Sequence, residues 1–320
     1  MQAVSPSDHL RLRRLMNPAF SPKAAERLRE DTRQIAMQAL AALPEDEVVD
    51  LAAFADYIPL RVVGRLFAIP AASEDAFLTF AQARIGLLNP LLPPSERDRL
   101  IRIVSEGFGL IAALIAERRV HPGDDLLSTL IHHEEAGARL SEYELMSMVG
   151  AIIVGGSDTT VHTLRFMLLN LLRNPEQLAR VRADTRLVGA LLEETLRFDQ
   201  FGKLGSPCYA LEDLSIRGVP IARGQMVIPM AGAATHDPEA FERPEVFDIG
   251  RTDLGVALNF GVGPHVCLGV HLARMEANVV VPLVLEHFPE MTLAGPPEYQ
   301  PSGFFRVMHR LPVRVRRAAA

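Results

Sequence analysis

One long helix, expected over residues 142–173, constrains the fold of this chain more than any other feature of its sequence. Ser141 and Glu144 form a Ser-x-x-Glu capping box, which marks a helix start, and Asn174-Pro175 marks its end. About 32 residues at roughly 1.5 Å each give a helix of roughly 48 Å. Because most of its sides are apolar, we expect it to cross the centre of a globular domain.

Helical periodicity also dominates the rest of the first two thirds of the chain. Further helices are predicted at 24–42, 51–67, 74–88, 95–119, 124–133, 175–183, 188–198 and 269–287, with a turn at 89–94. Pro59 is expected to kink or split the second of these. Short strands are predicted at 216–224, 226–230 and 307–315, and a meander at 237–251. This pattern favours a single mainly α domain over residues 1–320, with a small β portion near the C-terminus.

Composition narrows the class of protein. The 320 residues are 48% hydrophobic with a formal net charge of -6, so a large core is possible and a basic nucleic-acid-binding face is not expected. The two cysteines, Cys208 and Cys267, are too few for a disulfide framework. No stretch has a signal peptide's apolar core or approaches the roughly 18 apolar residues of a membrane span. We therefore expect a cytoplasmic protein without a membrane anchor.

The strongest chemical signal is the ten-residue string from Phe260 to Gly269, which contains Gly261, His265 and Cys267. Its glycines let backbone approach a flat ligand closely. A thiolate at the start of a helix is stabilised by the helix dipole, which lowers the thiol pKa, and a soft thiolate suits iron. A buried structural cysteine is the usual explanation of a lone cysteine, but the complete string favours a ligand.

A second signal, Gly155-Gly156-Ser157-Asp158-Thr159-Thr160, lies midway along the long helix. Each glycine costs about 1 kcal/mol against alanine in a helix, and close approach of a flat ligand would explain both. Asp158 beside the hydroxyl of Thr159 is a plausible proton relay. A helix kink whose polar residues face solvent is the alternative interpretation.

Two weaker signals pair residues on one helix face. Glu194 and Arg197 are three residues apart and can pair, although a surface ion pair is the usual explanation of such a spacing. His9 and Arg13 are four apart, and two cationic donors on one face suit an anion. An ordinary amphipathic basic helix is the alternative, and Arg11 and Arg14 point elsewhere, toward an acidic partner.

The string resembles Phe-Gly-x-Gly-x-His-x-Cys-x-Gly, the haem-binding signature of the cytochrome P450 family, and the other motifs occur in that family's order. The resemblance implies a P450-like fold in which Cys267 is the proximal thiolate ligand of haem b iron. It also implies that His9, Arg13 and His265 contact haem propionates, while Gly155, Phe260, Gly261 and Gly269 shape the cofactor site.

The resemblance further implies a monooxygenase. Thr159 would hydrogen-bond dioxygen, Asp158 would help deliver protons through water, and the Glu194–Arg197 ion pair would brace the haem loop. Electrons would come from NAD(P)H through a ferredoxin-type donor with its reductase. The substrate would be a small apolar organic molecule, for example a secondary metabolite such as a macrolide.

Three departures from the family pattern stand out. Only eight residues precede His9, where the family has early helices and part of the β-sheet, so the chain resembles an N-terminally truncated member. Cys208, expected to be a small buried residue, stands where the family has a propionate-binding Arg. Val246 replaces the Arg of Pro-x-Arg-Phe, a place that Arg243 or Arg251 could take.

Predicted pocket-lining segments are 77–92, 150–154, 201–204 and 302–305, mostly apolar, although each of these residues also fits an ordinary core. A different function stays open as well. A truncated or degenerate relative could bind haem, or nothing, without turnover.

Overall fold

The computed structural model describes residues 4–45, 47–89, 92–132, 139–202, 204–205, 207–254, 258–302 and 305–317. Several positions from predicted turns, helix ends and pocket segments lie outside the described residues, namely Pro90, Leu91, His133, Lys203, Ser206, Gly303 and Phe304.

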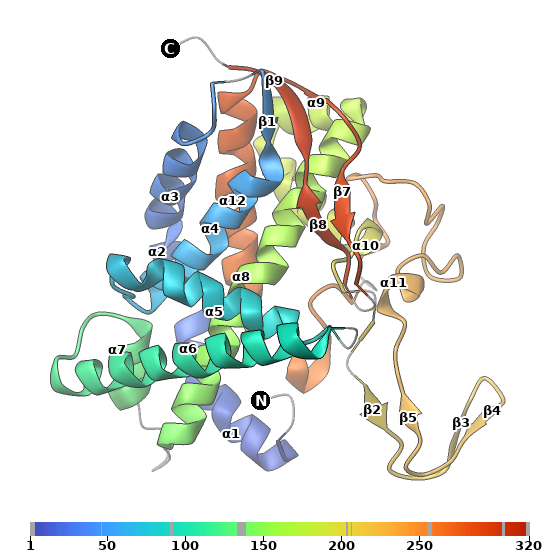
Figure 1. Ribbon diagram of the computed structural model, residues 1–320. Helices are drawn as coiled ribbons and strands as arrows, with labels where there is room; N and C mark the ends of the chain where they lie inside the picture. The colour runs from blue at the N-terminus through green and yellow to red at the C-terminus, as the bar shows by residue number, and fades with distance from the viewer. Residues whose placement is uncertain are drawn as a thin grey trace.

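The long helix is α8 (Glu142–Arg173), which runs through the middle of the molecule (Figure 1). The predicted capping box forms, because the Ser141 hydroxyl accepts from the Glu144 backbone and the Glu144 carboxylate accepts from the Ser141 backbone at 2.8 Å. These two bonds satisfy N–H groups that a helix start otherwise leaves free. The predicted span and its central position are confirmed.

The remaining helices surround α8 (Figure 1). They are α1 (Pro6–Met16), α2 (Pro22–Arg27), α3 (Arg29–Ala41), α4 (Leu51–Leu66), α5 (Glu74–Gly86), α6 (Pro94–Val120), α7 (Leu126–His132), α9 (Pro175–Ala183), α10 (Val188–Phe198), α11 (Ala231–Ala234) and α12 (Val270–His287). The helix predicted at 24–42 breaks at Leu28, between α2 and α3. Pro59 does not split α4, since it lies on that helix's buried side, where packing offsets the lost backbone hydrogen bond.

A small antiparallel sheet has the strand order β1 (Val48–Asp50), β9 (Pro312–Arg316), β6 (Glu290–Leu293). Beside it, β7 (Glu298–Gln300) pairs with β8 (Val307–Arg310). The extended segment predicted at 307–315 is thus two strands separated by Leu311. Strand β1 was not predicted, because three residues are too few to show a period of two.

A β arm extends from the body of the molecule (Figure 1). It contains the pair β2 (Cys208–Tyr209) and β5 (Met226–Val227), and the pair β3 (Leu214–Ile216) and β4 (Val219–Ile221). The strand predicted at 216–224 is wrong. Arg217 and Gly218 both have positive φ, at 48° and 81°, which makes a tight hairpin turn there.

Two apolar clusters form the core, and α4 and α8 contribute to both. The N-terminal half of α8, through Leu145, Val149 and Ile153, packs in one cluster with α5, α6 and α7. The C-terminal half, residues 164–171, packs in the other with α3, α10 and α12. Within the described residues, 154–163 of α8 belong to neither cluster. No described helix combines the length and apolar character needed to cross a membrane.

Candidate functional site

One face of α8 is open along its middle. Ala151, Gly155 and Thr159 are exposed, although their neighbours Ile153 and Ser157 are buried. A spacing of four residues puts these three positions on one face. A Cβ added to Gly155 would meet no described atom within 4 Å. We call Ala151, Gly155 and Thr159 the open stripe, which leaves room for a ligand against the central helix.

Gly156 serves a different purpose from Gly155. A Cβ at Gly156 would lie 2.8 Å from Cγ2 of Val63 on α4, closer than real side chains approach. The expectation that both glycines accommodate a flat ligand is therefore wrong for Gly156, which lets α8 pack closely on α4.

Asp158 and Thr159 lie on different sides of α8. The Thr159 hydroxyl, on the open stripe, donates to the Gly155 carbonyl at 2.6 Å. The Asp158 carboxylate faces the side packed against α4 and α5, where it lines a small cavity. Burial raises the pKa of Asp158 to about 6, against the influence of Arg165 and with a further increase from Asp56. Asp158 can therefore gain and lose a proton near neutral pH.

His162 lies one turn beyond Asp158, with its Nε2 3.9 Å from the nearer carboxylate oxygen. Burial, and then the charge of Arg165, lower the pKa of His162 to about 3. Its ring stacks on Phe201 at 4.4 Å, and Phe201 stacks on Phe305 at 4.6 Å. His162 is thus neutral at ordinary pH and packs as an aromatic ring.

The loop that carries Cys267 depends on two glycines. Gly261 and Gly263 have φ of 73° and 68°, a region that side chains with a Cβ rarely adopt. The Cys267 amide donates to the Phe260 carbonyl at 2.7 Å and closes the loop. Cys267 is exposed, and a Cβ at Gly269 would meet nothing within 4 Å. Cys267 is therefore accessible as a residue, and there is open space at Gly269.

Burial around the sulfur raises the pKa of the Cys267 thiol, although the residue as a whole is exposed. A hydrogen bond from the Gly269 backbone and the charge of Arg13 act in the opposite direction. The expected lowering by the helix start is thus outweighed in the unliganded protein. The described residues contain no group of three or more His, Cys, Asp or Glu that could hold a metal.

Cationic side chains gather near this loop. The rings of His9, on α1, and His265 lie 4.0 Å apart, tilted by 35°. Burial, His265 and Arg13 all lower the pKa of His9. None of the ion pairs among the described residues involves these three side chains. Donors gathered without an acid suit an anionic group such as a carboxylate. An apolar planar cofactor that carries carboxylates fits these residues.

The two neighbouring arginines of α1 differ. Arg11 pairs with Glu144 and lies 3.7 Å from Asp8, so the expectation that it points toward a partner is wrong. Arg14 is exposed.

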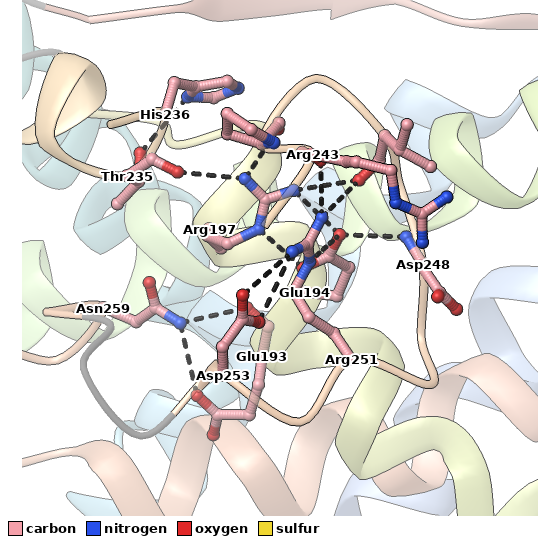
Figure 2. Close-up of polar contacts among 12 residues, drawn as sticks. Glu193, Glu194, Arg197, Thr235, His236, Arg243, Asp248, Arg251, Asp253 and Asn259 are labelled. Atoms are coloured by element: carbon pink, nitrogen blue, oxygen red, sulfur yellow. Dashed lines mark hydrogen bonds and ion pairs between the residues drawn. The ribbon is translucent and has the colours of Figure 1, made fainter. Parts of the chain in front are cut away.

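A buried ion pair joins α10 to the meander that precedes the loop (Figure 2). Arg197 on α10 donates to both oxygens of Glu194, at 2.7 and 2.8 Å. Both side chains are completely buried, so the pair is not the surface feature that its spacing alone suggests. Arg197 also donates to the carbonyls of Thr235, Pro244 and Val246. The brace ties α10 to the meander that precedes the loop.

Arg251 is the third member of this brace. Its Nε donates to Glu194 at 3.3 Å, and its side chain is 6% exposed. The side chain of Arg243, the other candidate, is 65% exposed, and its ion pair with Glu242 is long, at 4.0 Å. Figure 2 shows Arg251 beside Glu194. The contact that Val246 cannot make comes instead from a residue five positions later in the chain.

Glu193, which is not among the predicted site residues, joins both ends of the Cys267 loop to α10. Asn259, just before Phe260, donates to the Glu193 carbonyl and carboxylate at 3.0 and 3.3 Å. Arg274, in the second turn of α12, donates to the same carboxylate at 2.7 Å and lies over the Phe260 ring. Its position next to Glu194, about 100° around the helix, is the only signal that could have found it.

Two further expectations need correction. Cys208 is exposed rather than buried, because the β arm leaves β2 exposed on both faces. Of the predicted pocket segments, the first contributes Phe77 and Phe80 to the core, where they are 2% and 0% exposed. The last borders a groove of about 310 Å³ that includes Ser302 and Phe305.

The chain resembles a known protein family and several of its members in sequence and structure. The family model for cytochrome P450 matches residues 3–304. The chain is 38% identical to epothilone C/D epoxidase of Sorangium cellulosum, over 97% of this chain and 75% of that protein. It is 34% identical to the polyketide biosynthesis cytochrome P450 PksS of Bacillus subtilis, over 98% and 77%. The structure of epothilone B-bound cytochrome P450epoK superposes with a TM-score of 0.91 at 37% identity, over 98% and 80%. The chain thus spans about three quarters of the length of these relatives.

Proposed function

This chain belongs to the cytochrome P450 family and is a P450 monooxygenase, and on that premise we propose that it inserts one oxygen atom of O2 into an apolar organic substrate. The second oxygen atom leaves as water, and formation of this water consumes two protons and two electrons. NAD(P)H supplies the electrons through a ferredoxin-type protein and its reductase.

The observation that carries the proposal is the presentation of Cys267. The glycine turns and the contacts of Glu193 hold its loop, and Cys267 is exposed. We propose haem b as the cofactor, with Cys267 on the iron and His9, Arg13 and His265 on the propionates. Gly155 and Gly269 leave room for the ring, Gly261 makes the turn of the loop beside it, and Phe260 holds the loop. Haem held by a thiolate supplies oxygen activation.

Two residues of α8 have proposed roles in handling oxygen and protons. Thr159 lies on the open stripe, where its hydroxyl can donate to a bound oxygen molecule in place of the Gly155 carbonyl. Asp158 can exchange a proton near neutral pH, and in this proposal it supplies protons to the open stripe through water. Glu194 and Arg197 touch neither substrate nor cofactor in this proposal and only position the loop.

The substrate class follows from the relatives. Two of them act in epothilone and polyketide biosynthesis according to their names, and we propose a polyketide macrolide or a similar secondary metabolite for this chain. Phe305, which lines the groove of about 310 Å³, offers apolar surface to such a molecule. A substrate-induced spin-shift screen over polyketides would identify it.

The carbon monoxide difference spectrum of the reduced protein tests the ligand. We expect the red-shifted Soret band of thiolate-ligated haem, lost in Cys267→Ser and kept in Cys208→Ser. Absence of that band from the unaltered protein would overturn the proposal and favour a relative without turnover.

The role of Thr159 has its own test. In Thr159→Ala we expect more peroxide per NAD(P)H consumed, while Thr163→Ala, one turn further along α8, serves as the matched control. Unchanged peroxide release in Thr159→Ala would contradict the role of its hydroxyl.

A further inference from the structure

A small cavity separates α8 from α4 and α5 on the side away from the open stripe. It has a volume of about 20 Å³, which is room for about one water molecule. Four of its lining residues are polar. Asp158 and Ser157 come from α8, Asp56 comes from α4 and Gln82 comes from α5, while the rest of the lining, including Ala81, is apolar.

Exposure changes across this cavity from the surface inward. The Asp56 side chain is 47% exposed and Gln82 is also exposed, whereas the Asp158 side chain is 23% exposed. A water molecule in the cavity would therefore have a solvent-accessible carboxylate on one side and the relay carboxylate on the other. Polar partners on both sides are what an ordered internal water requires.

Arg165 fixes the outer carboxylate in place. Its Nη2 lies 2.5 Å from Oδ2 of Asp56, and its other donors are taken by the carbonyls of Ala52 and Met308. Its side chain is only 5% exposed. Because Arg165 is held by backbone on two elements, Asp56 is kept at the mouth of the cavity and does not swing out into solvent.

The charged groups around Asp158 are few. From α4 the carboxylate of Asp56 raises the pKa of Asp158, and from α8 itself Arg165 lowers it. His162, also on α8, stays neutral at ordinary pH. From α5 the cavity is lined by the neutral Gln82.

We infer that this cavity is the proton-uptake path of the enzyme. A proton passes from solvent to the Asp56 carboxylate and then through the cavity water to Asp158, whose delivery of the proton to the reaction belongs to the proposed function above. Asp56 is a proton carrier in this path, and Arg165 is a positioning residue. The inference rests on the proposed function of Asp158 and adds the route by which that residue is recharged.

The test measures proton arrival at Asp158 in the resting protein, without turnover. The infrared carboxyl band that disappears in Asp158→Asn reports this residue, and its growth is followed after a rapid drop in pH. Asp56→Asn removes the outer carrier, and Ala81→Val fills the cavity while keeping both acids. We expect protonation to slow in each, by up to about 100-fold, the lower end of what a positioned proton-transfer group contributes.

Glu74→Gln is the matched control. Glu74 pairs with Arg61 at 3.4 Å, joins α4 to α5 and has a side chain that is 18% exposed, but it does not line the cavity. Slower protonation in Asp56→Asn or Ala81→Val, with Glu74→Gln at the rate of the unaltered protein, supports the path. Unaltered rates in both cavity variants overturn it, as does equal slowing in all three.

This result is separable from the proposed function. A missing thiolate-haem spectrum would remove the proposed reaction, while the infrared rates would still decide whether protons reach Asp158 through the cavity. In a functional enzyme, the solvent isotope effect on oxygen turnover should also rise in Asp56→Asn and not in Glu74→Gln.

Discussion

Replacing Arg251 by alanine should destabilise the protein far more than the same change at Arg243. Arg251→Ala removes one partner of a buried pair, since Glu194 is completely buried and Arg251 is 6% exposed. Loss of one partner of such a pair costs about 3–5 kcal/mol. Glu194 keeps both bonds from Arg197 and one from the Asp248 amide, so we expect the lower end, about 3 kcal/mol.

Arg243→Ala is the control. Arg243 is mostly exposed and its nearest acid, Glu242, is 4.0 Å away, an arrangement that contributes less than about 0.5 kcal/mol. Urea unfolding followed by circular dichroism gives both free energies of unfolding, and the haem absorbance per protein reports whether the Cys267 loop keeps its shape. Arg251→Lys should fall between the two variants, because lysine keeps the charge but not the planar fork.

A rescue experiment tests the assignment directly. Val246 occupies the place of the Arg in Pro-x-Arg-Phe, so Val246→Arg combined with Arg251→Ala should recover part of the lost stability and haem content. Equal stabilities of Arg251→Ala and Arg243→Ala would refute the assignment of Arg251 to the brace.

Three further predictions concern buried groups. Glu276 is completely buried without a hydrogen-bond partner among the described residues, and burial raises its pKa well above the ordinary value. Protonated Glu276 contributes stability below the pKa of an unfolded carboxyl group, and this contribution is lost as pH rises. Urea unfolding should therefore show that the free energy of unfolding of Glu276→Gln increases relative to that of the unaltered protein toward pH 8. The pKa of Asp158 rises from 3.8 to about 6, so the free energy of unfolding of the unaltered protein should fall by roughly 3 kcal/mol between about pH 4 and pH 6. Asp158→Asn should abolish this fall, and equal pH profiles of the two proteins would contradict this. Gly107→Ala should lower the free energy of unfolding by about 1–3 kcal/mol, because its Cβ would lie 2.2 Å from the Phe80 ring; Gly109→Ala, with open space at that position, should not.

The sequence predicted those parts of the fold that local signals specify. The capping box at Ser141 and Glu144 and the terminating Asn174-Pro175 are chemical signals within a few residues of the helix ends, and α8 follows them. The break at Leu28 has no such signal. The backbone dihedral angles of Leu28 stay near helical values, so the break does not need a residue type that marks it in the sequence. The hairpin turn at Arg217 was missed because only Gly218 announces it.

At the site, residue types were predictable and their partners were not. The string around Cys267 indicated a ligand loop, but the thiol's environment depends on burial by segments distant in sequence. The choice between Arg243 and Arg251 required the three-dimensional structure, since both are the right residue type at a plausible distance along the chain. Gly155 and Gly156 are adjacent and identical, yet one faces open space and the other faces Val63.

The two apolar clusters meet α8 on either side of residues 154–163, which belong to neither cluster among the described residues. Each cluster has its own set of packed helices, so the two halves of the molecule resemble two cooperative folding units joined by shared helices. A flat apolar cofactor along the open stripe would touch the helix between them. Bound there, the cofactor would couple the opening of one half to that of the other, in addition to its chemical role.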